Sequence, residues 1–247
     1  MKKIFEGFLA RKLLGLKIGR SSHLLNSSPP EDKKNAMDAP AIYLEKMDEA
    51  LKRLLASEDF VKQSIRTGNV IDLESGALQI RKAMEAVAFA SIAPNKQQYE
   101  AVRRNAEKPI HFGNDWKADS IFLTLEKLNP DFYPNPVSGP VQTSPGHWHY
   151  DQVADGYLTK KNFEVLYKRL GKFLHADNPW GSDKGWKQIQ VDIPPAIEKI
   201  RSLLRKHRTM IREEKYSGVW IVDAPSDGTP SRMIQAIAEG DFIIPKK

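Results

Sequence analysis

Apolar residues recur at steps of three and four through most of the chain between residues 41 and 208. This spacing places them on one side of an α-helix and is typical of amphipathic helices. The earlier helices are predicted over residues 41–56, 57–67, 71–92, 96–106 and 115–128. Thr159 is a favourable N-cap for a further helix, and Pro194-Pro195 predict the start of a last one through about Lys206. The pattern indicates a mainly α protein built as a helical bundle.

The period of the pattern changes from helical to two beyond residue 216. Alternating apolar residues predict short strands over residues 218–223, 232–237 and 241–244, with turn-forming segments between them. We therefore expect a small C-terminal antiparallel β-meander that closes one side of the bundle.

The chain divides into four predicted regions: an amphipathic N-terminal helix over residues 1–20, a linker over 21–40, a helical bundle domain over 41–208 and a β-meander over 209–247. The N-terminal helix either binds a surface or docks on its own domain or on a partner subunit. Serine, proline and charged residues characterise the linker. No apolar run approaches the roughly 20 residues that span a bilayer, so no transmembrane segment is predicted.

The composition of the chain limits the kinds of chemical site that it can form. The chain has no cysteine, which excludes disulfides and thiolate zinc sites and favours a cytoplasmic location. The net charge of +7 favours acidic partners such as nucleic acid or anionic lipid, and is equally compatible with a basic protein that has no such partner. His147-Trp148-His149 has a spacing that can bind a metal from a strand, but two histidines are half of a usual ligand set. We therefore predict a loop or hairpin there, with no metal and no cofactor.

The candidate chemistry lies near the end of the helix that begins at Thr159. Arg169 and His175 are separated by five residues. An arginine can hold a phosphate through two parallel bonds, and a histidine can act as base or acid near neutral pH. On a straight helix this separation is about 600° of turn and roughly 9 Å of rise, so the two side chains point about 120° apart. They converge only if the helix frays or if a second subunit supplies the opposite pair.

Cations accompany this pair on the same segment. Lys168, Lys172 and His175 lie on one side of the predicted helix, at steps of four and three. Lys168 and Lys172 are therefore candidate phosphate-binding residues. A second group of cations surrounds the predicted end of the last helix and includes His207 and Arg208, where they suit the helix dipole or a phosphate backbone.

Supporting roles are predicted for Glu74, Arg81, Glu85, Asp177 and Asn178. Glu74, Arg81 and Glu85 fall close together on the helix over residues 71–92, where two carboxylates can pair with the guanidinium. We interpret this group as an ion network within the bundle. A structural alternative for the candidate pair is that Arg169 pairs with Glu74 or Glu85, and that His175 caps its helix or bonds Asp177.

Two segments together resemble HEPN domains. The segment LESGALQIRKAMEAVA at residues 73–88 is similar to an early helix of that family, and KRLGKFLHADNP at residues 168–179 is similar to its late Arg–His segment. The resemblance covers about residues 41–208. Catalytic members of the family are metal-independent endoribonucleases, often dimeric, and many act in toxin–antitoxin or antiphage systems. The resemblance implies that Arg169 and His175 are catalytic.

The sequence departs from the active pattern at Leu170, where active members commonly have a polar residue, and at Lys172, where one branch has asparagine. The resemblance thus implies a HEPN-type endoribonuclease or RNA-binding protein, with antiphage or toxin–antitoxin defence as its expected setting. RNA, a second copy of the chain and a protein partner or antitoxin are its expected partners. The alternative is a non-catalytic helical protein-interaction or assembly domain.

Overall fold

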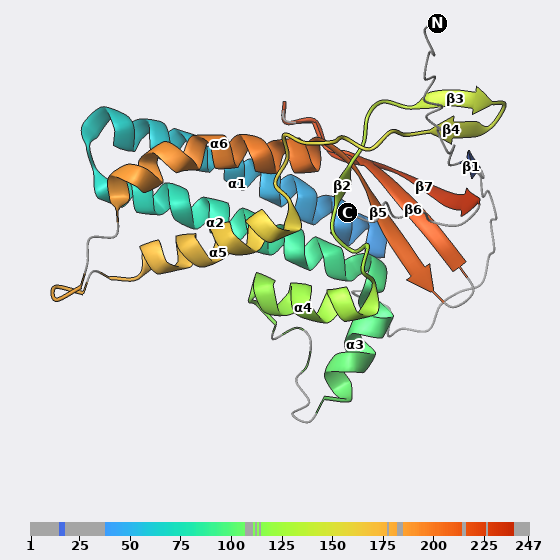
Figure 1. Cartoon of the computed structure of the whole chain (residues 1–247), viewed down its shortest axis with the longest axis horizontal. Coiled ribbons are helices and arrows are strands. Elements are labelled where there is room, and N and C mark those ends of the chain that lie inside the picture. Colours follow the sequence, from blue (N-terminus) through green and yellow to red (C-terminus); the bar gives the residue numbers. More distant parts are fainter. Residues whose placement is uncertain are drawn as a thin grey trace, which may run out of the picture.

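The computed structural model describes residues 15–17, 38–106, 111, 113, 115–176, 178–181, 185–213, 216–225 and 227–239. Helices form a bundle and an antiparallel sheet lies at one end of it (Figure 1). The helices are α1 Ala39–Thr67, α2 Val70–Ile92, the 3₁₀ turn η1 Ala93–Asn95, α3 Lys96–Arg104, α4 Ala118–Leu128, α5 Lys160–Leu174 and α6 Trp186–Arg205. The prediction of a mainly helical chain with a C-terminal antiparallel sheet is confirmed.

Helices α1 and α2 form a long antiparallel hairpin. Gly68 ends α1 in the left-handed conformation (φ 71°), which a glycine adopts without steric cost. The side chain of Asn69 then caps α2 by accepting a hydrogen bond from the amide of Ile71 at 3.0 Å. The turn between the two helices is thus specified by local residues, at the break that the predicted helices leave between residues 67 and 71.

The predicted break between residues 56 and 57 is wrong, because α1 is continuous there. Ser57 is fully buried, and its hydroxyl donates to the carbonyl of Gly76 in α2 at 2.8 Å instead of capping a new helix. A Cβ atom at Gly76 would lie 2.9 Å from Cγ2 of Val61. The small residue therefore permits the close approach of the two helices that this hydrogen bond requires.

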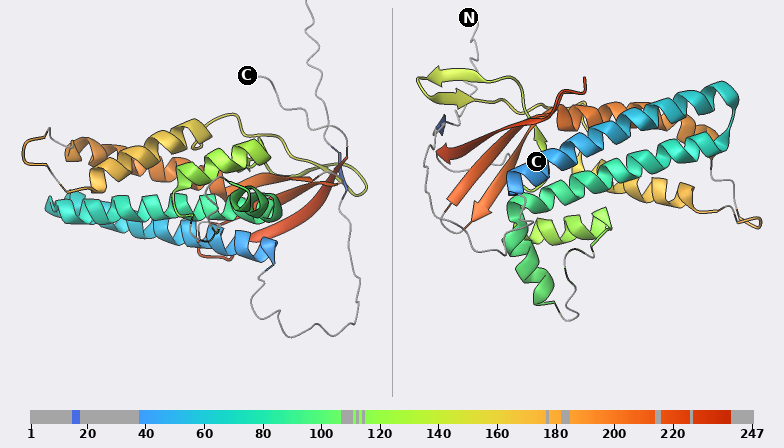
Figure 2. Two further views of the ribbon diagram at one scale, coloured as in Figure 1. Left: turned by 90° about the horizontal axis from the view of Figure 1, so that it is seen from below. Right: turned by 180° about the vertical axis from the view of Figure 1, so that it is seen from behind.

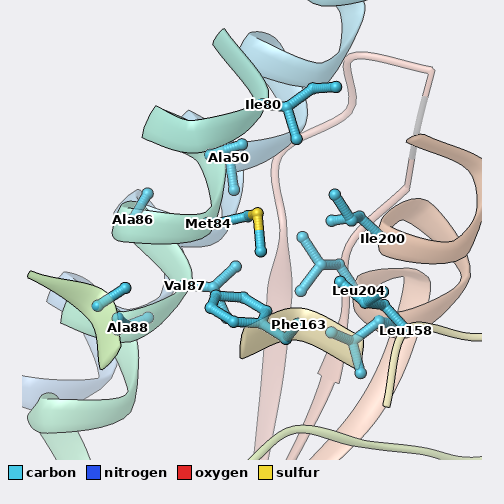
Figure 3. Packing of buried hydrophobic residues seen from close by; sticks show 14 of the residues in the cluster. Ala50, Ile80, Met84, Ala86, Val87, Ala88, Leu158, Phe163, Ile200 and Leu204 are labelled. Atoms are coloured by element: carbon cyan, nitrogen blue, oxygen red, sulfur yellow. The ribbon is translucent and has the colours of Figure 1, made fainter. Parts of the chain in front are cut away.

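The main hydrophobic core lies between α1, α2, α5 and α6 and continues onto the sheet. Figure 3 shows Met84 and Val87 of α2 facing Phe163 of α5 and Ile200 and Leu204 of α6. All five side chains are at most 1% exposed. Apolar burial of this kind, at about 25 cal/mol per Å², is the principal force that holds the helices together.

Helix α5 has the predicted start and apolar side. Thr159 is its N-cap and accepts a hydrogen bond from the amide of Asn162. Phe163, Leu170 and Phe173 are buried against the rest of the bundle. This leaves the opposite side of α5 exposed to solvent.

Helix α6 begins earlier than predicted, at Trp186, and contains Pro194 and Pro195 in its interior. A proline removes one hydrogen bond of a helix and normally interrupts it. Here the apolar stripe continues through the prolines, with Ile193 and Ile197 both 1% exposed. Packing of this stripe against the bundle outweighs the local preference.

The sheet has the order β2-β5-β6-β7-β1-β4-β3, and all the pairs are antiparallel. Its strands are β1 Gly15–Lys17, β2 Asn135–Pro136, β3 Val141–Ser144, β4 His147–His149, β5 Lys206–Glu213, β6 Tyr216–Asp223 and β7 Arg232–Glu239. Strands β6 and β7 match two predicted strands. The third, over residues 241–244, lies outside the described residues.

Two segments of the sheet correct the predictions. The chain leaves α6 at Arg205 and continues directly as β5, so His207 and Arg208 belong to a strand and not to a basic helix end. Residues 15–17 form β1 between β7 and β4, which overturns the helix predicted there. In both places long-range strand pairing overrides the local pattern. The remainder of the predicted N-terminal helix and most of the linker lie outside the described residues.

Candidate functional site

The exposed side of α5 carries the residues of the candidate site. Lys168, Arg169 and Lys172 are exposed there, and His175 is exposed just after the helix ends. The loop that follows lies at the end of the bundle farthest from the sheet, in all the views of Figures 1 and 2. The four predicted residues therefore share one solvent-accessible stretch of the chain.

Arg169 is ion-paired with a residue that the sequence did not indicate. Its Nη2 lies 2.5 Å from Oδ2 of Asp192, which joins α5 to α6. Gln188 donates to Oδ1 of the same carboxylate at 2.9 Å. The bond from Gln188 and the charge of Arg169 lower the pKa of Asp192. The predicted alternative partners, Glu74 and Glu85, are not the residues that pair with Arg169.

His175 occupies the C-cap position of α5. Its backbone is extended (φ −72°, ψ 152°), so the helix ends at Leu174 and the angle expected for a straight helix does not apply. The structure gives no hydrogen bond between Arg169 and His175 within the described residues. Both side chains are open to solvent, with 43% of the Arg169 side chain exposed. The pair is accessible to a ligand, but it is not preassembled.

Behind this surface, Arg81 of α2 holds the buried side of α5. Its Nη1 donates to the carbonyl of Tyr167 at 2.9 Å, and its Cζ lies 3.8 Å from the centre of the Tyr167 ring. The Tyr167 hydroxyl donates to Oε1 of Glu85 at 2.8 Å, and Nε of Arg81 lies 3.5 Å from the same oxygen. Burial, with Glu85 adding to it, raises the pKa of Tyr167. We call Arg81, Glu85 and Tyr167 the α2–α5 clamp.

Gly171 is explained by the clamp. A Cβ atom at this position would lie 2.5 Å from Nη1 of Arg81, so a side chain there would displace the guanidinium. The sequence indicated Arg81 and Glu85 as an ion network, and the structure brings them together. It did not indicate Tyr167, although the position falls between Phe163 and Leu170 on the apolar side of α5.

The other predicted supporting residues are Glu74, Asp177 and Asn178. Glu74 is half-buried on α2, and the structure gives it no bond to Arg81 or Arg169 within the described residues. Asp177 lies outside the described residues. Asn178 accepts two backbone hydrogen bonds in the loop after α5, from the amides of Trp180 at 3.1 Å and Gly181 at 2.8 Å. Its role is to shape that loop.

A cavity of about 510 Å³ lies elsewhere, on the surface of α1 and α2. It is lined by Glu45, Asp48, Glu49, Lys52, Arg53, Ala56 and Gln79. Arg53 is bonded to Glu49 and Gln79, so these polar groups largely satisfy one another. None of the candidate residues lines this cavity.

The histidines of β4 form part of the predicted hairpin. His149 pairs with Asp151, with 3.0 Å between Nε2 and Oδ1. Across the part of the chain that the structure describes, no cluster of three or more metal-binding side chains is found. Nor does any helix in that part have both the length and the apolar character to cross a membrane.

Searches of protein-family models, curated proteins and solved structures found no match to this chain. The class of protein is therefore described by its architecture alone, a helical bundle with an antiparallel sheet at one end. HEPN membership, dimerisation, an antitoxin and a role in defence stay predictions from the sequence.

Proposed function

We propose that this protein binds RNA through the exposed side of α5. The observation that carries the proposal is the row formed by Lys168, Arg169 and Lys172, which is exposed on one helix and leads into the exposed imidazole of His175. Such a row can neutralise phosphates and release their counterions. The net charge of +7 supports a polyanionic partner. The choice of RNA among polyanions comes from the HEPN resemblance.

The α2–α5 clamp supports the same proposal. It fixes the buried side of α5 through contacts to a backbone carbonyl and an aromatic ring of that helix. The cations on the opposite side are therefore carried by a rigid element, which lowers the entropic cost of holding a strand.

The HEPN resemblance extends the proposal from binding to metal-independent cleavage. In that reaction the 2′-hydroxyl attacks the adjacent 3′-phosphate, and the bond from phosphorus to the 5′-oxygen of the next nucleotide breaks, which leaves a 2′,3′-cyclic phosphate and a 5′-hydroxyl. His175 moves a proton as base at the 2′-hydroxyl or as acid at the leaving 5′-oxygen, and Arg169 stabilises the charge of the phosphorane. Because Arg169 is paired with Asp192, cleavage would require a phosphate to displace that carboxylate. Binding is thus supported directly by the exposed cations, whereas cleavage depends on this exchange.

The binding proposal predicts a loss of affinity in Lys168→Ala/Lys172→Ala. We expect RNA binding to weaken about tenfold at near-physiological salt, and the slope of log affinity against log salt to fall by about 2, because two phosphate contacts are lost. Fluorescence anisotropy with labelled RNA measures both. The matched control is Arg104→Ala/Lys127→Ala, which removes the same charge from exposed positions on α3 and α4. Equal losses in the two variants would show that only net charge matters and would refute the site.

The cleavage extension is tested by gel assay of RNA in excess EDTA. Asp192→Asn frees Arg169 while keeping the shape of its partner, so cleavage should accelerate and RNA affinity should rise about threefold. His175→Ala should abolish the cleavage and leave binding nearly intact. RNA that stays whole with both the wild-type protein and Asp192→Asn would restrict the function to binding.

A further inference from the structure

Trp180 is exposed to an unusual degree. Its side chain is 92% exposed, whereas the buried Trp220 is 5% exposed and Trp116, also at the surface, is 60% exposed. A large aromatic side chain held in water gives up the favourable free energy of its burial. An indole in this position is typical of a contact with a partner.

A tight turn presents this indole. The amide of Gly181 donates to the carbonyl of Asn178 at 2.8 Å and closes a four-residue turn. Pro179 fixes the backbone at the second position, and the side chain of Asn178 accepts from the amide of Trp180 at 3.1 Å. Trp180 therefore occupies the third position of a turn whose backbone is already ordered, in the segment that connects α5 to α6.

The charges around the turn indicate different roles for α5 and for the loop that follows it. Lys172 and the imidazole of His175, both part of the candidate site, immediately precede the loop. The loop itself has Asp177 and Asp183 in its sequence and so carries no clear excess of positive charge. Phosphates would therefore be held by α5, and the distinctive contribution of the loop is the indole.

We infer that Trp180 is a stacking platform for an unpaired base of single-stranded RNA whose phosphates lie along α5. This inference rests on the proposed function and adds the class of RNA. A base in a duplex has its faces covered by its neighbours and cannot stack on an external ring, whereas an unpaired base can. Cations beside an exposed aromatic ring form the combination that proteins use to bind single strands without reading their sequence.

Anisotropy titrations with a short oligouridylate and with an RNA duplex of the same length test the inference. Trp180→Ala should weaken binding of the single strand about tenfold, within the range of one base–aromatic stack, and leave duplex binding unchanged. Trp180→Phe, which keeps an aromatic face, should recover most of the loss. The matched control Trp116→Ala removes an exposed tryptophan that lies beside Lys117 just before α4, outside the α5–α6 loop, and should change neither affinity.

The outcomes separate this inference from the function on which it rests. If Lys168→Ala/Lys172→Ala loses RNA while Trp180→Ala binds both RNAs normally, the α5 site stands and the stacking role is refuted. If the wild-type protein binds neither RNA, both proposals fail. Vesicles of anionic lipid are the third arm: binding that depends on Trp180 there, and not with RNA, would overturn the inference in favour of a membrane surface.

Discussion

His207 belongs to β5, contacts Tyr43 of α1 in the core and has no solvent exposure. Its Nδ1 is 2.8 Å from the carbonyl oxygen of Leu204, which can only accept, so Nδ1 carries the proton. Nε2 then accepts a hydrogen bond from the hydroxyl of Tyr43 at 2.8 Å. Burial lowers the pKa of His207 to about 4. The imidazole is therefore neutral in the folded protein at neutral pH.

This residue predicts an acid-sensitive stability. The unfolded chain takes up the proton near pH 6.5, whereas the folded chain resists it until about pH 4. Between these values the unfolded state binds more protons, so the free energy of unfolding should fall as the pH is lowered, by up to about 3 kcal/mol. Above about pH 6.5 this contribution is fully present. Urea unfolding at pH 7 and at pH 4.5 measures the difference.

A comparison with His175 identifies the group responsible. His175→Asn alters an exposed imidazole and should keep the whole pH dependence, whereas His207→Gln should lose it in this window. If His207→Gln does not fold, the imidazole resonances of the wild-type protein decide instead. A His207 signal that titrates near pH 6.5 in the folded state would contradict the prediction.

At the scale of elements, the packing of α5 against α2 depends on the absence of a side chain at Gly171. Alanine in place of glycine normally stabilises a helix by about 1 kcal/mol. At position 171 its Cβ would meet the guanidinium of Arg81, which is held by the carbonyl and ring of Tyr167. The loss of that charged hydrogen bond, about 1.5–3 kcal/mol, outweighs the helical gain.

We therefore expect Gly171→Ala to destabilise the protein by about 1 kcal/mol. In an Arg81→Ala background the obstacle is gone, so the same substitution should stabilise by about 1 kcal/mol. Chemical unfolding of the four proteins of this double-mutant cycle gives both values. The same sign in the two backgrounds would show that Arg81 and Gly171 do not oppose each other.

The helices that could be predicted are those with local signals. Thr159 marked the start of α5, and the end of α1 at residue 67 was predicted, because caps and left-handed glycines such as Gly68 act within a few residues. The continuity of α1 through Ser57 and of α6 through Pro194 could not be predicted in the same way. Both depend on partners far along the chain, the carbonyl of Gly76 in one case and the packed stripe of α6 in the other.

For the candidate site, the spacing of residues along the helix predicted which side chains are exposed, but not which residues they pair with. The side of α5 opposite the apolar stripe had to face water, so the accessibility of Lys168 and Lys172 followed from the pattern. The pairing of Arg169 with Asp192 did not, because it depends on how α5 and α6 lie against each other. The exposure of Trp180 was not predicted either, since the composition of the chain does not show which tryptophan side chain remains in solvent.

At the scale of the whole molecule, helices and sheet share one interior. The main core includes Trp220 and Val222 of β6 together with side chains from the bundle, and Tyr43 of α1 contacts both His207 and Trp220 through its ring. A change in the packing of β5, which carries His207, or of β6, which carries Trp220, therefore affects α1 directly. This continuity explains why the pH dependence of a single imidazole is expected to affect global unfolding.

The position of β1 has a consequence for synthesis of the chain. Residues 15–17 leave the ribosome early, yet their two neighbours in the sheet are β4, at residues 147–149, and β7, at residues 232–239. The helices can dock while translation continues, because their contacts are made largely between nearby segments. This strand, however, cannot complete its backbone pairing until residues 232–239 of β7 have been synthesised.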